Sequence, residues 1–153
     1  MHNPVIIDSQ SGEKVINAQA PFILALKQGE SLFDSILHLA HDAKLLSASI
    51  SGLGGLSMVE VAYYDINEKK YQTKLFSPMH ELISMNGNIA FLDGKHFIHI
   101  HAAIGDEEYK VFGGHIMSAT VNPSAEITII PLNGKIERKY DAATGLKLMC
   151  PIV

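Results

Sequence analysis

The sequence is poor in cysteine and in long apolar runs, and both scarcities exclude classes of protein. Its 153 residues contain one cysteine, Cys150, so no disulfide can form within the chain, as is typical of a reducing compartment. The longest apolar runs, such as residues 127–132, end after a few positions and are too short to span a bilayer. Residues 1–10 carry neither a basic stretch nor a long apolar segment. We therefore expect a cytoplasmic protein with no signal peptide and no membrane partner.

Arginine is also scarce, because Arg138 is the only one in the chain. The 12 basic and 16 acidic residues give a formal net charge of −4. Proteins that bind nucleic acid through its phosphates carry a basic excess, and arginine is the commonest reader of base edges. Direct DNA binding is therefore disfavoured by both the charge and the arginine content.

What the chain does contain is the composition of one globular domain. Apolar residues make up 47% of it and charged residues 18%, which is too apolar for a disordered protein. No internal repeat, low-complexity segment or linker rich in proline, glycine and serine divides the sequence. We expect a single domain over residues 1–153.

One segment has helical periodicity. Between Leu32 and Ala43, apolar side chains recur three and four residues apart. Ser31 precedes them as a candidate N-cap, and Asp34 three residues later forms an acidic variant of a capping box. The pattern predicts one principal helix over residues 32–43.

The remaining apolar pattern alternates with a period of two, which predicts strands. The predicted strands cover residues 20–27, 48–52, 58–63, 70–76, 81–85, 88–92, 95–104, 108–112 and 125–130. Asn86-Gly87 is a strong tight-turn dipeptide and is expected to join two of them as a hairpin. The fold class is α/β (α+β), with a mainly antiparallel sheet and the helix packed on it. The apolar end of the tail is expected to pack on the body or on another subunit; it consists of Leu146, Leu148, Met149, Ile152 and Val153.

Three histidines form the strongest candidate for chemistry. His99 and His101 are separated by one residue, and in a strand such side chains point to one face with roughly 6.5 Å between their Cα atoms. Imidazoles at this spacing can converge on one ion at roughly 2.1 Å per bond. The neighbouring Ile98 and Ile100 would then face the core.

His115 lies on the same face as this pair only if the register between the two strands places it there, which depends on the length of the loop between them. With a three-residue loop after Gly105, antiparallel pairing places His115 opposite His99, and all three imidazoles share a face. A two-residue loop would instead turn His115 to the other face. The preceding Gly113 and Gly114 favour a metal site because they remove side-chain bulk beside the ion and permit a bulge.

Three imidazoles suit a divalent transition metal, and zinc is the ion we expect. They leave a tetrahedral ion with an open fourth position for water or substrate. Glu126 is a candidate to orient a histidine N–H group or to act as a catalytic base. The alternative is a polar strand face whose histidines only hydrogen-bond, with Glu126 an exposed acid.

These segments together resemble the PPC (plants and prokaryotes conserved) domain. Its most specific element is Val111-Phe112-Gly113-Gly114-His115, preceded by His99-x-His101 and followed by Ala125-Glu126-Ile127. Gly52-Leu53-Gly54-Gly55 fits the same pattern, and we interpret it as a tight turn or a close backbone approach between subunits. The resemblance covers roughly residues 21–132, which leaves a core of about residues 20–132 and a C-terminal tail of residues 133–153.

The resemblance implies a compact fold around an antiparallel sheet and a homotrimer. In similar prokaryotic members, the histidines at the positions of His99, His101 and His115 are candidate metal ligands. Plant members carry an AT-hook, an Arg-Gly-Arg-Pro-type peptide that enters the minor groove, whereas Arg138 is followed here by Lys139-Tyr140. We therefore assign the DNA-binding label of prokaryotic relatives to the hook and treat the domain as an assembly and protein-interaction module.

Three functional hypotheses follow, and the sequence supports no specific enzymatic activity. The first is a trimeric metal-binding module with an interaction or regulatory role and protein partners. The second is a metal-dependent hydrolase or lyase that uses a water bound by His99, His101 and His115, with Glu126 as the base. The third is direct DNA binding, which the charge ranks last.

Overall fold

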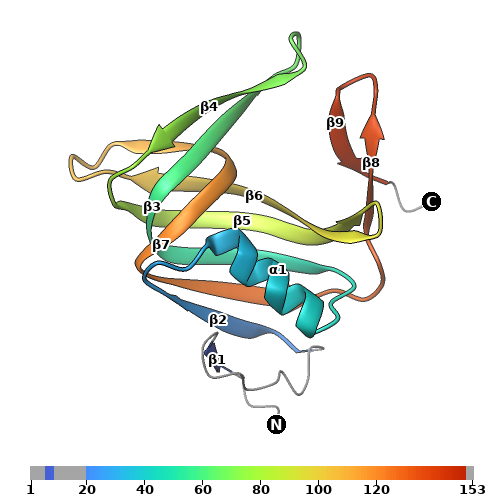
Figure 1. Ribbon diagram of the computed structural model, residues 1–153, viewed down its shortest axis with the longest axis horizontal. Helices are drawn as coiled ribbons and strands as arrows, with labels where there is room; N and C mark the ends of the chain where they lie inside the picture. Colours follow the sequence, from blue (N-terminus) through green and yellow to red (C-terminus); the bar gives the residue numbers. More distant parts are fainter. Residues whose placement is uncertain (1–5, 9–19, 151–153) are drawn as a thin grey trace.

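Figure 1 shows the computed structural model of the chain, which describes residues 6–8 and 20–150. In this part of the chain, one helix and nine strands follow one another along the sequence. They are β1 Ile6–Asp8, β2 Phe22–Lys27, α1 Leu32–Asp42, β3 Ala48–Asp65, β4 Lys70–Phe76, β5 His80–Leu92, β6 Lys95–Gly105, β7 Val111–Pro131, β8 Glu137–Asp141 and β9 Leu146–Met149.

The strands belong to one mainly antiparallel sheet in the order β1-β2-β7-β3-β5-β8-β9, with β4 paired to β3. Strand β6 pairs with both β5 and β7, and these two strands also pair with β3, so the hydrogen-bonded path β3-β5-β6-β7 closes on itself. Parallel pairing occurs at β1 with β2 and at β5 with β8. The predicted fold class, a mainly antiparallel sheet with one helix packed on it, is confirmed.

Helix α1 forms where its cap and periodicity predict it and lies against one face of the sheet (Figure 1). The Ser31 hydroxyl oxygen accepts a hydrogen bond from the Asp34 backbone N–H at 3.3 Å, which satisfies one of the free donors of the first turn. The apolar face of the helix is fully or almost fully buried; it consists of Leu32, Ile36, Leu39 and Ala40.

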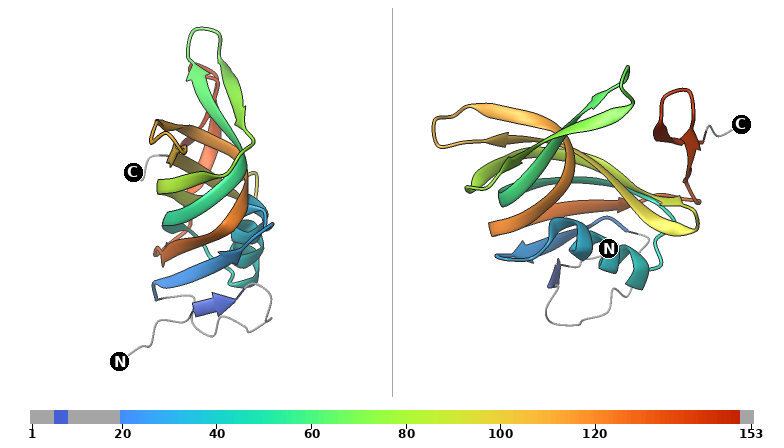
Figure 2. Two further views of the ribbon diagram at one scale, coloured as in Figure 1. Left: turned by 90° about the vertical axis from the view of Figure 1, so that its left-hand side faces the viewer. Right: turned by 45° about the horizontal axis from the view of Figure 1, so that its top comes forward.

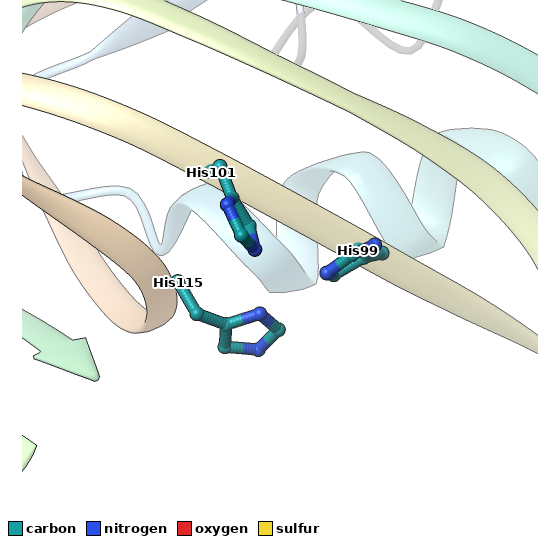
Figure 3. A group of neighbouring side chains, drawn as sticks. All are labelled: His99, His101 and His115. Atoms are coloured by element: carbon teal, nitrogen blue, oxygen red, sulfur yellow. The ribbon is translucent and has the colours of Figure 1, made fainter. Parts of the chain in front are cut away.

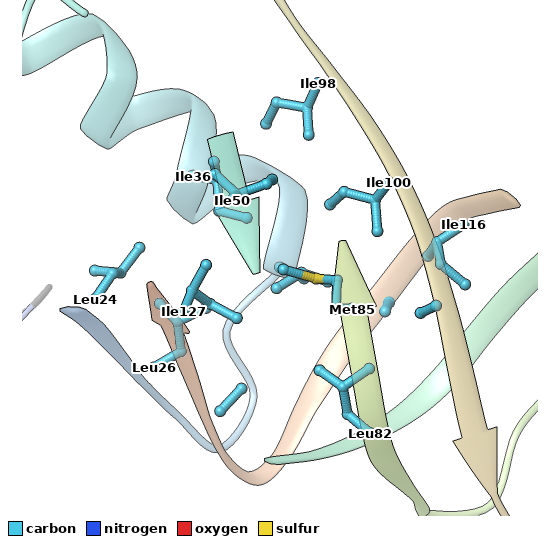
Figure 4. Packing of buried hydrophobic residues seen from close by; sticks show 14 of the residues in the cluster. Leu24, Leu26, Ile36, Ile50, Leu82, Met85, Ile98, Ile100, Ile116 and Ile127 are labelled. Carbon is cyan, nitrogen blue, oxygen red and sulfur yellow. The ribbon is translucent and has the colours of Figure 1, made fainter. Parts of the chain in front are cut away.

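The core lies between this helix and the sheet (Figure 4). It is built from alternate side chains of the strands and from the buried face of α1. The residues labelled in the figure are Leu24, Leu26, Ile36, Ile50, Leu82, Met85, Ile98, Ile100, Ile116 and Ile127. Ile98 and Ile100 are 7% and 0% exposed, as predicted for the residues between the histidines of β6. Burial of this β6 face turns the intervening histidines away from the core.

The prediction of a hairpin at Asn86-Gly87 is wrong, because β5 runs through both residues. The turn lies at Asp93-Gly94, where both residues have positive φ and Leu92 pairs with Lys95. This is the two-residue geometry that an Asp-Gly dipeptide favours. It lets β5 and β6 pair along their whole length and bury their isoleucines together, which a turn at Gly87 would prevent.

Gly87 serves a different purpose, since β6 passes close to it. A Cβ atom at this position would lie 2.2 Å from the His99 carbonyl oxygen. Gly54 is constrained in the same way, because its Cβ would lie 2.4 Å from the Ser124 carbonyl oxygen of β7. The expected tight turn at residues 52–55 is therefore absent, and the close backbone approach occurs within the chain, inside the continuous strand β3.

Strand β7 joins two strands that the sequence pattern separates. Pro123, which cannot donate a backbone hydrogen bond, lies where the pairing of β3 with β7 shifts register between Gly54 and Leu56. The strand continues across this interruption and carries Ile116 and Val121 into the core.

The C-terminal tail forms the β8–β9 hairpin, which stands beside the tip of the β3–β4 hairpin (Figure 2). Its tip is tied to the body by hydrogen bonds from Tyr64 Oη to the Thr144 carbonyl (2.7 Å) and from Lys69 Nζ to the Ala142 carbonyl (2.8 Å). The tail therefore contacts the body, although Leu148 and Met149 stay 41% and 40% exposed. Ile152 and Val153 lie outside the described residues. Within residues 6–8 and 20–150, no helix combines the length and apolar character needed to cross a membrane.

Candidate metal centre

The three predicted histidines meet on one face of the sheet (Figure 3). His99 and His101 project from β6 and His115 from β7, and their candidate ligand atoms all lie within 4.8 Å of one another. The ring centroids are 4.9, 5.0 and 5.4 Å apart, so the imidazoles surround a common space. Spacing of this order leaves a gap in which one ion can contact all three rings.

The predicted pairing of β6 with β7 is wrong by two residues, but the three histidines still lie on one face. His115 pairs with His101 and not with His99, because the loop after Gly105 is residues 106–110 and not three residues long. The Asp106 carboxylate accepts hydrogen bonds from the backbone N–H groups of Glu108 and Lys110 and so stabilises the longer loop. A shift of two residues returns each side chain to the same face, so the histidines still converge.

Gly114 lines the same cavity as the three histidines, at a point where β7 runs between β3 and β6. A Cβ atom there would lie 2.7 Å from the Ala62 carbonyl oxygen of β3, and one at Gly113 would lie 2.7 Å from the Ala102 carbonyl oxygen of β6. Both glycines therefore permit close strand approach, which differs from the reason for which the sequence singled them out.

Burial keeps two of the imidazoles neutral. The pKa of His99 is lowered from 6.5 to about 4, mainly because burial disfavours its charged form, with further repulsion from Arg138, His115 and His101. The pKa of His115 is also lowered, first by burial and then by the charges of His101 and Arg138. A metal ligand must be the neutral imidazole, so these shifts keep both rings ready to bind near pH 7.

Arg138 of β8 is the group that the sequence analysis missed. It is only 8% exposed, and its Nη2 atom lies 3.0 Å from Asn88 Oδ1 and 3.2 Å from His99 Nδ1. Its Nη1 donates to the Lys147 carbonyl at 2.9 Å, while its guanidinium carbon lies 5.4 Å from the Phe97 ring centroid. Nothing in the local sequence distinguishes it from a solvated residue, because its neighbours are lysine and glutamate. That it is the only arginine of the sequence was the one feature that could have drawn attention to it.

The donor set fits a divalent transition metal. Within the described residues, His115 Nδ1 is buried and has no hydrogen-bond partner, which is costly unless another group takes its lone pair. Arg138 opposes metal binding at His99. A guanidinium only donates hydrogen bonds, so its contact uses the lone pair of His99 Nδ1. Loading an ion on His99 would require Arg138 to release this contact, and Asn88 and Lys147 would still hold the guanidinium.

The triad forms part of the lining of a cavity of about 750 Å³. Its walls are mainly aromatic and aliphatic and come from α1, β3, β4, β6 and the β8–β9 hairpin; they include Phe33, Leu37, Tyr63, Tyr71, Phe97 and Leu148. Tyr71 stacks on His115 with 5.1 Å between ring centroids. The volume is in the range of small-molecule sites and far exceeds what a single ion fills.

Glu126 is not brought to the triad. It lies further along β7, where it pairs with Ala25 and Leu53, and it lines a separate recess with Ser51 and Ile83. Among the described residues that line the triad's cavity there is no aspartate or glutamate. A catalytic base or orienting carboxylate for the histidines is therefore not supplied by Glu126 in this chain.

The other described histidines have separate surroundings. His38 and His41 are exposed on α1, as expected of a solvated pair. His80 is buried, with Nδ1 2.9 Å from the Pro78 carbonyl oxygen, and His96 lies with Nε2 2.7 Å from the Leu45 carbonyl oxygen. These contacts give His80 and His96 structural roles.

Comparison with known proteins identifies the family. No curated protein matches the chain. Among solved structures, a metal-containing protein from Archaeoglobus fulgidus is 34% identical, with a TM-score of 0.81, over 86% of this chain and 93% of its own. A plant- and prokaryote-conserved (PPC) protein from Pyrococcus horikoshii is 30% identical, with a TM-score of 0.80, over 87% and 92%. A candidate DNA-binding protein from Ralstonia eutropha is 27% identical, with a TM-score of 0.78, over 85% and 90%.

A family model covers most of the chain as well. It matches residues 13–133, which include all three histidines and end before the β8–β9 hairpin. The histidine cluster is thus part of the matched region, and Arg138 lies beyond it. The chain belongs to the Plants and Prokaryotes Conserved (PCC) domain family, also written PPC.

Proposed function

We propose that the chain is a trimeric, divalent-metal-binding PPC protein with an interaction or regulatory role in the cytoplasm, and that zinc is its ion. The observation that carries the proposal is the convergence of His99, His101 and His115, whose ligand atoms lie within 4.8 Å of one another. The Archaeoglobus fulgidus protein, described as metal-containing, supports it by similarity at 34% identity. Three histidine ligands with an open fourth position are a coordination set in which zinc is found.

Metal analysis of untagged protein tests the metal assignment. Purified protein is loaded with zinc, dialysed and analysed by inductively coupled plasma mass spectrometry, with one zinc per chain expected. His101→Ala should abolish retention, whereas His41→Ala, an exposed histidine of α1, should retain the ion. Substoichiometric metal in the wild-type protein, or equal loss in both variants, would contradict the assignment.

The proposed trimer rests on the sheet face opposite α1. Large apolar side chains lie exposed there on neighbouring strands, including Ile23 (40%), Leu53 (55%) and Ile83 (52%). An apolar sheet face of this kind marks an interaction surface. Light scattering coupled to size exclusion should give three chains per particle. Leu53→Glu should reduce that mass, and the surface variant Asp34→Asn should not.

A second candidate function is DNA binding, which the Ralstonia eutropha relative favours. The charge of −4 and the burial of the sole arginine oppose it, because a side chain 8% exposed cannot reach a phosphate or a base edge. A mobility-shift assay at low salt decides the matter. A complex whose affinity falls steeply with salt would promote this function above the first.

A metal-dependent hydrolase or lyase is the third candidate, and the 750 Å³ cavity beside three imidazoles favours it. None of the described residues that line the cavity is a carboxylate that could act as the base. Turnover of small esters, phosphates or lactones that disappears with both chelation and His115→Ala would establish it.

A further inference from the structure

The lining of the cavity beside the histidines combines two kinds of group. Aromatic and aliphatic side chains make up most of it, while Arg138 lies against His99 and the Lys147 ammonium lies 5.6 Å from the Phe97 ring centroid. Within residues 20–150, no acidic side chain lines it to balance these charges. A cavity with an apolar body and a few convergent polar groups is the usual form of a small-molecule site.

Among the described residues, Arg138 is a buried charge with no carboxylate among its hydrogen-bond partners. Its three hydrogen-bond partners, Lys147 O, Asn88 Oδ1 and His99 Nδ1, are all neutral groups. Its Nε atom is buried and, within the described part of the chain, has no partner. A buried guanidinium normally pairs with an anion, because burial without one costs several kcal/mol. The arrangement is therefore electrostatically incomplete.

Metal binding would increase this imbalance and free a donor. A neutral imidazole has one lone pair on its unprotonated nitrogen, so His99 cannot accept from Arg138 and ligate an ion at once. When His99 ligates the ion, the Arg138 Nη2 N–H group that contacts its ring in this structure becomes available to a ligand. Three imidazoles add no negative charge, so the ion's charge also stays unbalanced within the cavity.

We propose that this cavity binds a small organic carboxylate with an apolar or aromatic body, held at its charged end by Arg138 and the metal and along its body by the aromatic walls. The inference rests on the proposed metal function. A carboxylate fits because its planar pair of oxygens matches a guanidinium and its single charge suits a cavity that is otherwise apolar. Tyr71, Phe97 and Phe33 supply the surface for the body of the ligand.

The alternative is that Arg138 only fastens the β8–β9 hairpin to β5 and β6. Such a fastening role predicts that replacing Arg138 leaves the affinity for a charged ligand unchanged. Comparing an acid with its amide tests the preference of the cavity for a carboxylate, to which a bound ion would also contribute, and the Arg138 variant isolates the part of Arg138. Phenylacetate and phenylacetamide share a shape but differ in charge and in one hydrogen-bonding group, and octanoate tests an aliphatic body.

Isothermal titration calorimetry with these probes, on zinc-loaded protein of measured zinc content, tests the inference. We expect phenylacetate and octanoate to bind, and phenylacetamide to bind at least about tenfold more weakly, the size of one charge-assisted hydrogen bond. Arg138→Met should reduce phenylacetate affinity by at least about tenfold while zinc content is unchanged. Lys135→Met, which removes a positive charge outside the cavity, should leave it unchanged.

The outcomes distinguish this inference from the metal function. Protein that holds one zinc but binds acid and amide equally, or neither of them, overturns the carboxylate site and leaves the metal function intact. Protein that holds no zinc overturns the metal function directly. Because Arg138→Met can loosen the hairpin, thermal unfolding is measured in parallel. If the variant does not fold, the acid-to-amide ratio in the wild-type protein still decides whether the cavity takes a carboxylate.

Discussion

Strands β6 and β7 carry the histidines, and the β8–β9 hairpin carries the arginine that contacts them. The first region lies within the family match at residues 13–133 and the second lies beyond it. Strand β6 turns Ile100 into the core at 0% exposure, whereas Leu148 of the hairpin is 41% exposed. One region is therefore fixed by the core, and the other rests on it through a few polar contacts.

This difference separates two properties of the site. The position of the imidazoles follows from strand pairing and core packing, which resist change because interiors are closely packed. The charge beside them comes from a peripheral segment that can be altered without repacking the core. Metal retention and ligand selection should therefore respond to different substitutions.

The largest expected effect is the loss of zinc affinity when a histidine of β6 or β7 is replaced. Replacing His99 or His115 by alanine should weaken zinc binding by more than about 100-fold, since even the loss of an outer hydrogen-bond partner costs 10–100-fold. Competition with a chromophoric chelator measures the affinity, with His41→Ala as the control. Retention of nanomolar binding by either variant would show that the ion sits elsewhere.

The packing difference predicts unequal costs of truncation. Ile100→Ala should lower the free energy of unfolding by about 2–5 kcal/mol, because it leaves a cavity in the closed core. Leu148→Ala should cost less than about 1 kcal/mol, because the side chain is partly exposed on the hairpin. Urea denaturation of the metal-free proteins measures both. Similar costs would mean that the hairpin belongs to the same cooperative core.

Arg138→Met should raise zinc affinity, by up to about tenfold. The guanidinium repels a bound cation and uses the His99 lone pair, so its removal favours the ion on both counts. The same chelator competition detects the change. A fall in affinity would instead show that Arg138 orients His99 for the metal.

The smallest effect concerns pH, since His99 is partly exposed and solvent screens its charge. The pKa of His99 is about 4 in the folded protein against 6.5 for the free group. Protons therefore bind the unfolded state first as pH falls below 6.5, and the stability contributed by the neutral ring is lost progressively towards pH 4. The urea midpoint of metal-free wild type should drop more between pH 7.5 and 5 than that of His99→Gln. An equal or smaller drop would contradict the lowered pKa.

Local patterns predict the helix and most strands well because their causes are local. Ser31 caps α1, and alternation places Ile98 and Ile100 in the core and the histidines outside. The hairpin at Asn86-Gly87 was wrong because the chain contains a competing dipeptide at Asp93-Gly94, and only the pairing with β6 selects between them. The residue types indicate where a turn can form, whereas burial of the paired strands determines which of these turns does form.

By itself, the sequence determined the residue types of the site and the faces on which they lie, because side-chain direction follows from the period of a strand. It also determined the family, through the Gly-Gly-His element and its neighbours. The tertiary structure alone decided that His115 pairs with His101, that Glu126 lies elsewhere, and that Arg138 covers His99. These depend on loop length and on contacts between residues 39 or more positions apart, which no local pattern encodes.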